Sequence, residues 1–266
     1  MQTRASSDFL YQVFALILAL ILVHTFYLTL IRPNANALLQ QQLAREAAGE
    51  PYVAERSFYI VVKDYEQEAC FVLMLWAFAI MGLKARNAIG ERKLLTGQLL
   101  NVSDGTRILP EDARQMSRPI QALPDAQKDY LVSRSLLAAL RRFDSTRNIQ
   151  DVSSAVSEVL DTESDRLDSE LSMVRYIAWA IPSIGFIGTV RGIGEALSQA
   201  HKAVQGDIAG VTTSLGVAFN STFIALVISI VVMFLMHQLQ LMQERLVLDT
   251  HSYCDDSLLR HLKTDG

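Results

Sequence analysis

Three uncharged polar side chains in the last third of the chain are the residues best suited to chemistry. Thr189 lies in the apolar stretch IPSIGFIGTVRGIG, and Thr213 and Asn220 share one helical side of the next apolar stretch, seven positions apart. Such groups on two packed helices can hold water or steady a carboxylate in a dry environment, so they could line a narrow polar ion path. Helix packing, with each hydroxyl bonded to its own backbone, is the alternative for each residue alone.

Glycines at helical spacing surround Thr189. Gly185, Gly188 and Gly192 follow one another at intervals of three and four residues, and Gly216 lies on the polar side of the next apolar stretch. An interior glycine destabilises a helix by up to about 1 kcal/mol relative to alanine, so retained glycines indicate close approach of another backbone. In a membrane, small residues let helices pack at short distance. These glycines therefore predict a helix-packing motif at the pore.

Ionisable groups are scarce in the apolar stretches. Arg191 and Glu195 are one turn apart and are predicted to pair as rim residues. The bilayer-depth portions of the predicted spans contain no Asp, Glu or Lys, so a partner would have to supply a titrating carboxylate if the chain moves ions. His24 lies inside the first apolar block, where an ionisable group is a functional candidate. A neutral imidazole bonded to a helix carbonyl is an equal alternative for His24.

Several other chemistries are excluded by pattern. The sequence has no phosphate-binding loop, nucleophile elbow or metal-ligand spacing, so it predicts no catalytic residue, no metal site, no cofactor and no enzyme. Gly192 and Gly194 form a GxG without a preceding strand, which is a weak dinucleotide signal. The net charge of -4 argues against a nucleic-acid partner. Cys70 and Cys254 indicate no disulfide framework.

Four apolar blocks position the polar residues. Phe9–Ile31 carries no formal charge and exceeds both the roughly 20 residues that cross a hydrocarbon core and the apolar region of a secretory signal. Ala69–Leu83 is shorter, but its helix can begin upstream among lipid headgroups; a re-entrant or buried helix is the alternative. Val174–Ile193 and Thr213–Met236 are the third and fourth blocks. The predicted fold is an all-α polytopic protein in a lipid bilayer, with four transmembrane helices.

The segments between the blocks set the topology. Pro33 disfavours helical geometry at Arg32, so a turn is expected after the first span, and Gly49 and Pro51 are expected to end the helix that follows. Apolar stripes continue from the third and fourth spans and predict two long helices extending into the cytoplasm. Four basic residues follow the second span: Lys84, Arg86, Arg92 and Lys93. By the positive-inside rule they place the end of that span in the cytoplasm. Four spans put both termini on that same face of the membrane.

The predicted organisation has four parts. They are transmembrane helices 1 and 2 with a polar periplasmic connection (1–84), a cytoplasmic helical insert (85–173), transmembrane helices 3 and 4 as the channel core (174–236), and a cytoplasmic C-terminal helix (237–266). Under this organisation, the glycine motif and the polar residues fall in the third part.

Two motifs resemble the MotA/TolQ/ExbB proton-channel family. GFIGTVRGIG (Gly185–Gly194) is similar to the glycine-framed GTVxG pattern of that family, and VTTSLGVAF (Val211–Phe219) to its Thr-x-x-Gly entry to the last helix. Two early spans, a large cytoplasmic insert and two late spans resemble the MotA layout. Arg191 departs from the pattern, because related sequences often carry an uncharged residue there.

The resemblance implies a bacterial inner-membrane subunit that forms a homopentamer around two copies of a single-span partner with a protonatable aspartate. By motif, Thr189 and Thr213 would be pore-facing hydroxyls near that aspartate. Proton flow would drive mechanical work in a stator-like motor complex, with sodium as the alternative coupling ion. A non-conducting oligomeric membrane scaffold is the runner-up. A solute carrier is less favoured, because the sequence has no apparent inverted repeat.

Overall fold

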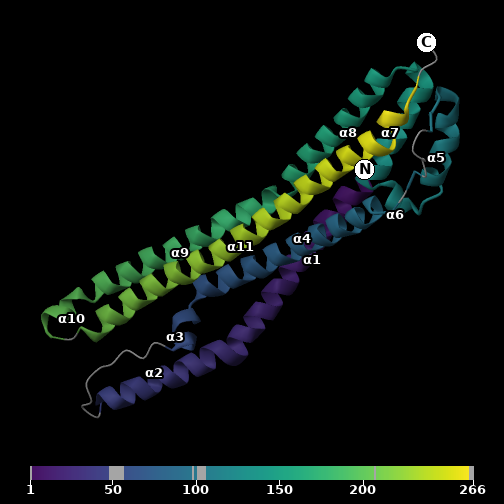
Figure 1. Cartoon of the computed structure of the whole chain (residues 1–266). Coiled ribbons are helices and arrows are strands. Elements are labelled where there is room, and N and C mark those ends of the chain that lie inside the picture. The colour runs from purple at the N-terminus through teal and green to yellow at the C-terminus, as the bar shows by residue number, and fades with distance from the viewer. Residues whose placement is uncertain (1, 48–56, 98, 101–105, 207, 264–266) are drawn as a thin grey trace. The chain divides into compact units, whose positions relative to one another are not determined.

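The structure is a computed structural model of the 266-residue chain, and it describes residues 2–47, 57–97, 99–100, 106–206 and 208–263. Helices dominate the described part (Figure 1). In chain order they are α1 (Gln2–Phe26), the π-helical turn η1 (Tyr27–Ile31), α2 (Arg32–Ala47), α3 (Phe58–Val62), α4 (Tyr65–Leu95), η2 (Pro110–Asp112), α5 (Ala113–Gln121), α6 (Asp125–Lys128), α7 (Leu131–Thr146), α8 (Ile149–Glu170), α9 (Ser172–Ser198), α10 (Ala200–Val204), α11 (Ala209–Ser257) and η3 (Leu259–His261).

The chain divides into two compact units. The first, which we call the membrane unit, comprises Met1–Met81 and Met173–Met236. The second, which we call the insert unit, comprises Gly82–Ser172 and His237–Gly266. The residues predicted to line an ion path all belong to the membrane unit.

Among the described residues, four helical segments are long and apolar enough to cross a membrane: Phe9–Gln42, Tyr65–Leu95, Ile149–Ser198 and Ala209–His261. Many large apolar side chains on them are exposed in the single chain, among them Trp179 at 78%. Exposed apolar faces of this extent suit lipid or another subunit. The structure confirms the predicted all-α, four-span fold, and α4 has 31 residues, enough for a complete second span.

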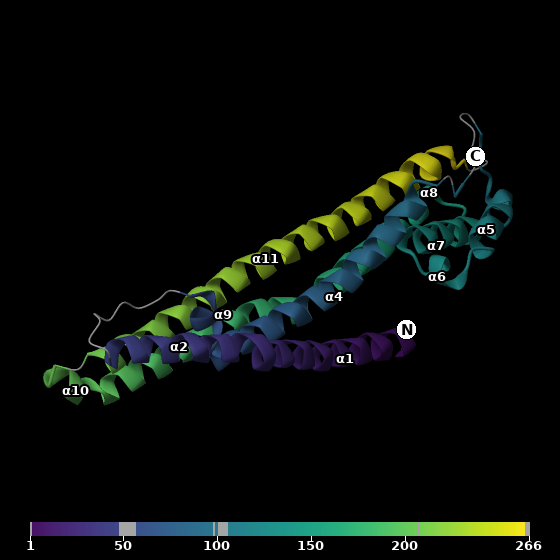
Figure 2. The same ribbon diagram turned by 90° about the horizontal axis from the view of Figure 1, so that it is seen from below.

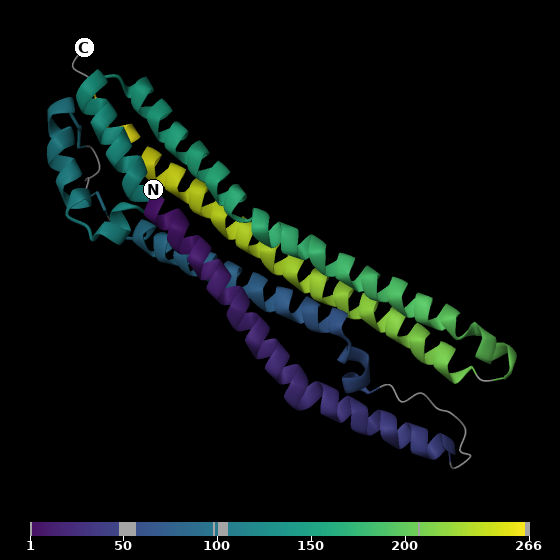
Figure 3. The ribbon, with the colours of Figure 1, turned by 180° about the vertical axis from the view of Figure 1, so that it is seen from behind.

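The expected turn after the first span is wrong. Arg32 is helical, with φ -65° and ψ -43°, and the helix continues through η1 into α2 (Figure 3). In η1 the Arg32 N–H donates to the Tyr27 carbonyl, five residues back. The wider π turn accommodates Pro33, whose ring would clash with the carbonyl four residues back in a regular α-helix. Gly49 and Pro51 lie outside the described residues.

The two predicted long helices differ in continuity. α11 runs unbroken for 49 residues from Ala209 to Ser257, as the uninterrupted sequence after Gly216 predicted. The third span and the helix before it are separated at Leu171, whose N–H donates to the carbonyls of Asp168 and Ser169. The apolar stripe therefore predicted the helical content on both sides, but it gave no signal for this break.

Within the membrane unit, α9 and α11 run side by side and are joined through α10 (Figures 1 and 3). A Cβ added at Gly192 would lie 2.7 Å from the Ser214 carbonyl oxygen and 2.8 Å from the Ala218 amide nitrogen, so only glycine permits this approach. A Cβ at Gly185 would overlap the Ala225 side chain. The two helices therefore make backbone contact along the glycine face of α9.

The remaining motif glycines lie in different surroundings. A Cβ at Gly188 would lie 2.5 Å from Ser221 Cβ on α11 and 3.2 Å from Glu66 Cγ on α4, so three helices meet at this position. Gly216 and Gly194 have open space around the position of a Cβ within one chain. The packing role of Gly216 therefore stays a prediction, since no neighbouring atom approaches it within one chain.

In the insert unit, α7 packs against α8 and α5 packs against α7 (Figure 2). Tyr253 of α11 accepts hydrogen bonds through its hydroxyl from the Leu99 and Leu100 amides at 3.1 and 3.3 Å. The apolar core of this unit joins all of these elements and includes Leu131, Leu136, Leu140, Phe143, Val152, Val156, Cys254 and Leu258. It gives the unit a hydrophobic core of its own.

We expect Gly192→Ala to lower the free energy of unfolding by about 1–3 kcal/mol, because the new methyl group would press on the α11 backbone. Gly194→Ala, two residues further along α9, is the matched control. It enters open space and replaces glycine in a helix, so it should leave stability unchanged or raise it by up to about 1 kcal/mol. Thermal unfolding of the detergent-purified protein measures both changes, and equal effects of the two substitutions would contradict the packing described.

Candidate functional site

Thr189 lies half-buried on α9 with its hydroxyl directed at α11. Its Oγ1 can donate to the Ala218 carbonyl at 3.1 Å or to the Gly185 carbonyl of its own helix at 3.3 Å, and it is hydrogen-bonded to Thr222 Oγ1. Thr222 Oγ1 can also donate to Gly185 O, at 3.3 Å. Each hydroxyl has one proton, so the two threonines share alternative acceptors and can exchange donor and acceptor roles.

The other predicted path residues lie elsewhere on α11. Thr213 is exposed near the start of the helix, and its hydroxyl donates to the Ala209 carbonyl at 2.9 Å. Asn220 is half-buried on the same helix. The structure thus brings Thr189 together with Thr222, whereas Thr213 stands at the α11 surface of the single chain. No sequence signal singled out Thr222 among the small residues that recur along the same apolar block, which also include Ser214, Ala218, Ser221, Ala225 and Ser229.

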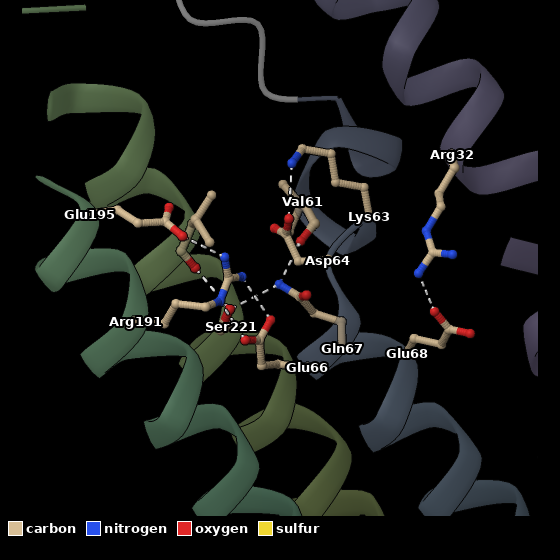
Figure 4. Close-up of polar contacts among 11 residues, drawn as sticks. Arg32, Val61, Lys63, Asp64, Glu66, Gln67, Glu68, Arg191, Glu195 and Ser221 are labelled. Atoms are coloured by element: carbon tan, nitrogen blue, oxygen red, sulfur yellow. Dashed lines mark hydrogen bonds and ion pairs between the residues drawn. The ribbon is translucent and has the colours of Figure 1, made fainter. Parts of the chain in front are cut away.

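Arg191 forms a fork-like ion pair with a residue that the sequence pattern did not indicate. Its Nε and Nη2 donate to Oε1 and Oε2 of Glu66 at 2.7 and 2.9 Å (Figure 4). The expected pair with Glu195 is also present, with Arg191 Nη1 donating to Glu195 Oε1 at 2.9 Å. The Arg191 guanidinium therefore links Glu66, in the first turn of α4, to Glu195, one turn further along α9.

The residue after Glu66 ties α4 to α11. The Gln67 side chain is buried, and its Nε2 donates to the Val61 carbonyl at 3.2 Å and to Ser221 Oγ at 3.3 Å. Ser221 in turn donates to the Val217 carbonyl of its own helix at 2.9 Å. These bonds hold the start of α4 against the helix pair that contains Thr189.

Glu68 points to the other side of α4. It accepts from the Arg32 guanidinium and contacts His24 Nδ1 through Oε1 at 2.6 Å. Arg32 also lies over the Tyr65 ring, 4.4 Å from its centroid. The partner of His24 is thus a carboxylate, and the alternative of a bond to a helix carbonyl is wrong. The apolar blocks themselves contain no carboxylate, but the Glu68 carboxylate, which precedes the second block, contacts His24 inside the first block.

Apart from Thr222, the site residues missed from the sequence come from a single short run of α4. Glu66, Gln67 and Glu68 precede the second apolar block as the run EQE, a position typical of polar headgroup contacts. Successive side chains on a helix point in different directions, so Glu66 contacts α9, Gln67 contacts α11 and Glu68 contacts the first span. The polar run itself was visible, but its partners depended on how the spans pack.

Other chemistry finds little support in the described part of the chain. No group of three His, Cys, Asp or Glu side chains there is placed to hold a metal ion. Cys70 and Cys254 are both buried and free. The polar and charged side chains around α9 are engaged with one another and with backbone carbonyls, an arrangement that suits hydrogen-bond exchange and ion-pair positioning.

Comparison with known proteins gives one match. Residues 127–251 match the family model described as the MotA/TolQ/ExbB proton channel family. This segment contains the glycine motif of α9, the Thr189–Thr222 pair, Arg191 and most of α11. No curated protein and no solved structure matches the chain. Through residues 127–251, a little under half of its length, the chain is similar to the MotA/TolQ/ExbB proton channel family.

Proposed function

We propose that this chain is the ion-conducting subunit of an inner-membrane motor complex that converts the proton-motive force into mechanical work through a single-span partner. The observation that carries the proposal is the hydroxyl pair of Thr189 and Thr222, held between α9 and α11 with the Gly185 and Ala218 carbonyls as alternative acceptors. Both helices fall largely within the segment that matches the proton channel family.

The hydroxyl pair suits a carboxyl group that changes its protonation state. A threonine hydroxyl can donate to a carboxylate and can accept from a protonated carboxylic acid. Each threonine hydroxyl also has a backbone carbonyl acceptor within reach. When the carboxyl group is protonated and donates to the threonine, the hydroxyl can therefore rotate and donate its own proton to that carbonyl. The titrating group comes from the partner, since Glu66 and Glu68 are already engaged by arginines.

An oligomer accounts for the exposed parts of α9 and α11. Phe186, Ile187 and Phe219 are each at least 60% exposed in the single chain, and the Thr213 hydroxyl stands near the start of α11. In a homopentamer around two partner helices, neighbouring subunits cover the apolar side chains and Thr213 faces the partner. Asn220 and Gly216, which share the helical side of Thr213, then line the path around the partner helices.

A non-conducting oligomeric scaffold is the second candidate, and one observation favours it. The Thr189 hydroxyl is fully satisfied by groups of its own chain, which is what packing alone requires. The two candidates differ in what happens when the hydroxyl is removed while its volume is kept.

We expect Thr189→Val and Thr213→Val to preserve assembly and to reduce proton flux by at least about tenfold, because each removes a hydrogen bond made to the titrating group. Flux is measured with a pH-sensitive dye in proteoliposomes that contain the chain and its co-purified single-span partner. Thr212→Val is the matched control, since its exposed hydroxyl bonds only to the Ile208 carbonyl among the contacts described. Unchanged flux in both test variants would favour the scaffold; a parallel sodium gradient identifies the coupling ion.

Gly188→Leu should abolish oligomer formation, because the position is enclosed by Ser221 and Glu66 and a larger side chain would separate α9 from α11 and α4. The mass of the oligomer, and hence its number of subunits, is measured by native mass spectrometry after extraction in detergent. Gly194→Leu, at an open position of α9, serves as the control for bulk and hydrophobicity. Normal oligomers of the Gly188 variant would count against the glycine packing of α9 on α11 and α4.

We expect both termini in the cytoplasm and α10 on the outer side. A Val204→Cys variant should react with a membrane-impermeant maleimide in intact cells, since Val204 is 90% exposed on α10. Leu248→Cys, on the exposed surface of α11, should react only after permeabilisation. The native Cys70 and Cys254 are buried and should give little background. The reverse labelling pattern would invert the topology.

A further inference from the structure

Arg191 is an unexpected neighbour for a cation path. It follows the Thr189 hydroxyl by two residues on α9 and keeps its positive charge at every physiological pH. A positive rim lowers the local concentration of cations, and rings of arginine or lysine are typical of anion pathways. A cation channel with this residue needs a compensating negative charge close by.

The structure supplies two such charges. Glu66 receives both arms of the guanidinium fork and Glu195 receives the third nitrogen. One cation with two carboxylates leaves a net charge of +1 - 2 = -1 for this cluster. The Arg191 and Glu195 side chains are 39% and 47% exposed, so the cluster reaches the surface of the chain, where an approaching ion senses its net charge.

The position of Glu66 is determined by the packing of three helices. Its Cγ would lie only 3.2 Å from a Cβ at Gly188, the residue directly before Thr189. Gln67 anchors the same turn of α4 to Ser221 on α11 (Figure 4). The side chain of Glu66 is 11% exposed, so its carboxylate has little freedom to leave the fork. The absence of a side chain at Gly188 therefore makes room for the carboxylate that neutralises Arg191.

We propose that Glu66 is a specificity-determining residue of the ion path: together with Glu195 it reverses the charge that Arg191 gives the rim, so that the rim attracts cations. This inference rests on the proposed channel function. In an oligomer the cluster is repeated around the path, and its net negative charge acts in the manner of the acidic rings of cation channels.

The test is a charge series in the full-length chain, reconstituted with its co-purified partner and assayed for proton flux at low ionic strength. Arg191→Gln gives a cluster charge of -2, the unchanged chain -1, Glu195→Gln 0, and the double variant Glu66→Gln with Glu195→Gln +1. We expect flux to fall by roughly threefold for each unit of positive charge added, as a single charge acting across several ångströms of water would produce.

Salt separates an electrostatic role from a structural one. The differences within the series should shrink at 1 M potassium chloride, where the Debye length is about 3 Å, whereas a packing defect would persist. The double variant Glu66→Gln with Arg191→Gln keeps the cluster at -1 and should retain near-normal flux. The Glu195 side chain is exposed, so Glu195→Gln should not disturb packing. If Glu66→Gln fails to assemble, Arg191→Gln, the unchanged chain and Glu195→Gln still compare cluster charges of -2, -1 and 0.

Asp125→Asn is the control for charge alone, because it removes one negative charge from a side chain that is 99% exposed in the insert unit. It should leave the flux and its salt dependence unchanged. A flat charge series, or an equal effect of Asp125→Asn, would overturn the assignment of Glu66. If Thr189→Val still abolishes flux in that case, the channel function is supported and only the proposed role of Glu66 is wrong. If Thr189→Val also has no effect, the proposed channel function itself is wrong.

Discussion

Backbone contact between α9 and α11 is the constraint on which the rest of the membrane unit depends. Gly185 and Gly192 leave no room for a Cβ, so the helices meet at the distance of their main chains. Only at that distance does the Thr189 hydroxyl reach the Ala218 carbonyl and Thr222 on the facing helix. Without an aqueous phase between spans, close packing and interhelical hydrogen bonds are the main forces that can hold such a pair together.

The first turn of α4 completes this arrangement through charge pairing. Ionisable groups near a membrane are stable when they pair with one another, and the run Glu66–Glu68 meets that requirement in two directions. Glu66 pairs with Arg191 on α9, and Glu68 pairs with Arg32 and His24 of the first span. A polar turn at the start of one span thereby connects all four spans, with Gln67 bound to α11.

These contacts divide the chemistry between this chain and its proposed partner. The chain provides hydroxyls that can donate or accept, and it provides charged groups that are already engaged. Such a site can respond to a carboxyl group that gains and loses a proton, but its own carboxylates are held by guanidinium groups. The division agrees with the similarity of residues 127–251 to a proton channel family, and it gives Arg191, the main departure from the family pattern, a partner of opposite charge.

The sequence by itself determined the helical, four-span architecture, the unbroken length of α11 and the presence of a glycine face around Thr189, because span length, hydropathy and glycine spacing are properties of a single helix. Tertiary structure decided which polar groups meet. The Glu66–Arg191 pair joins residues 125 positions apart, and Thr222 became the partner of Thr189 only through the register of two packed helices. The helical path through Pro33 was likewise decided in three dimensions, because a π turn removed the steric conflict that the local rule assumes.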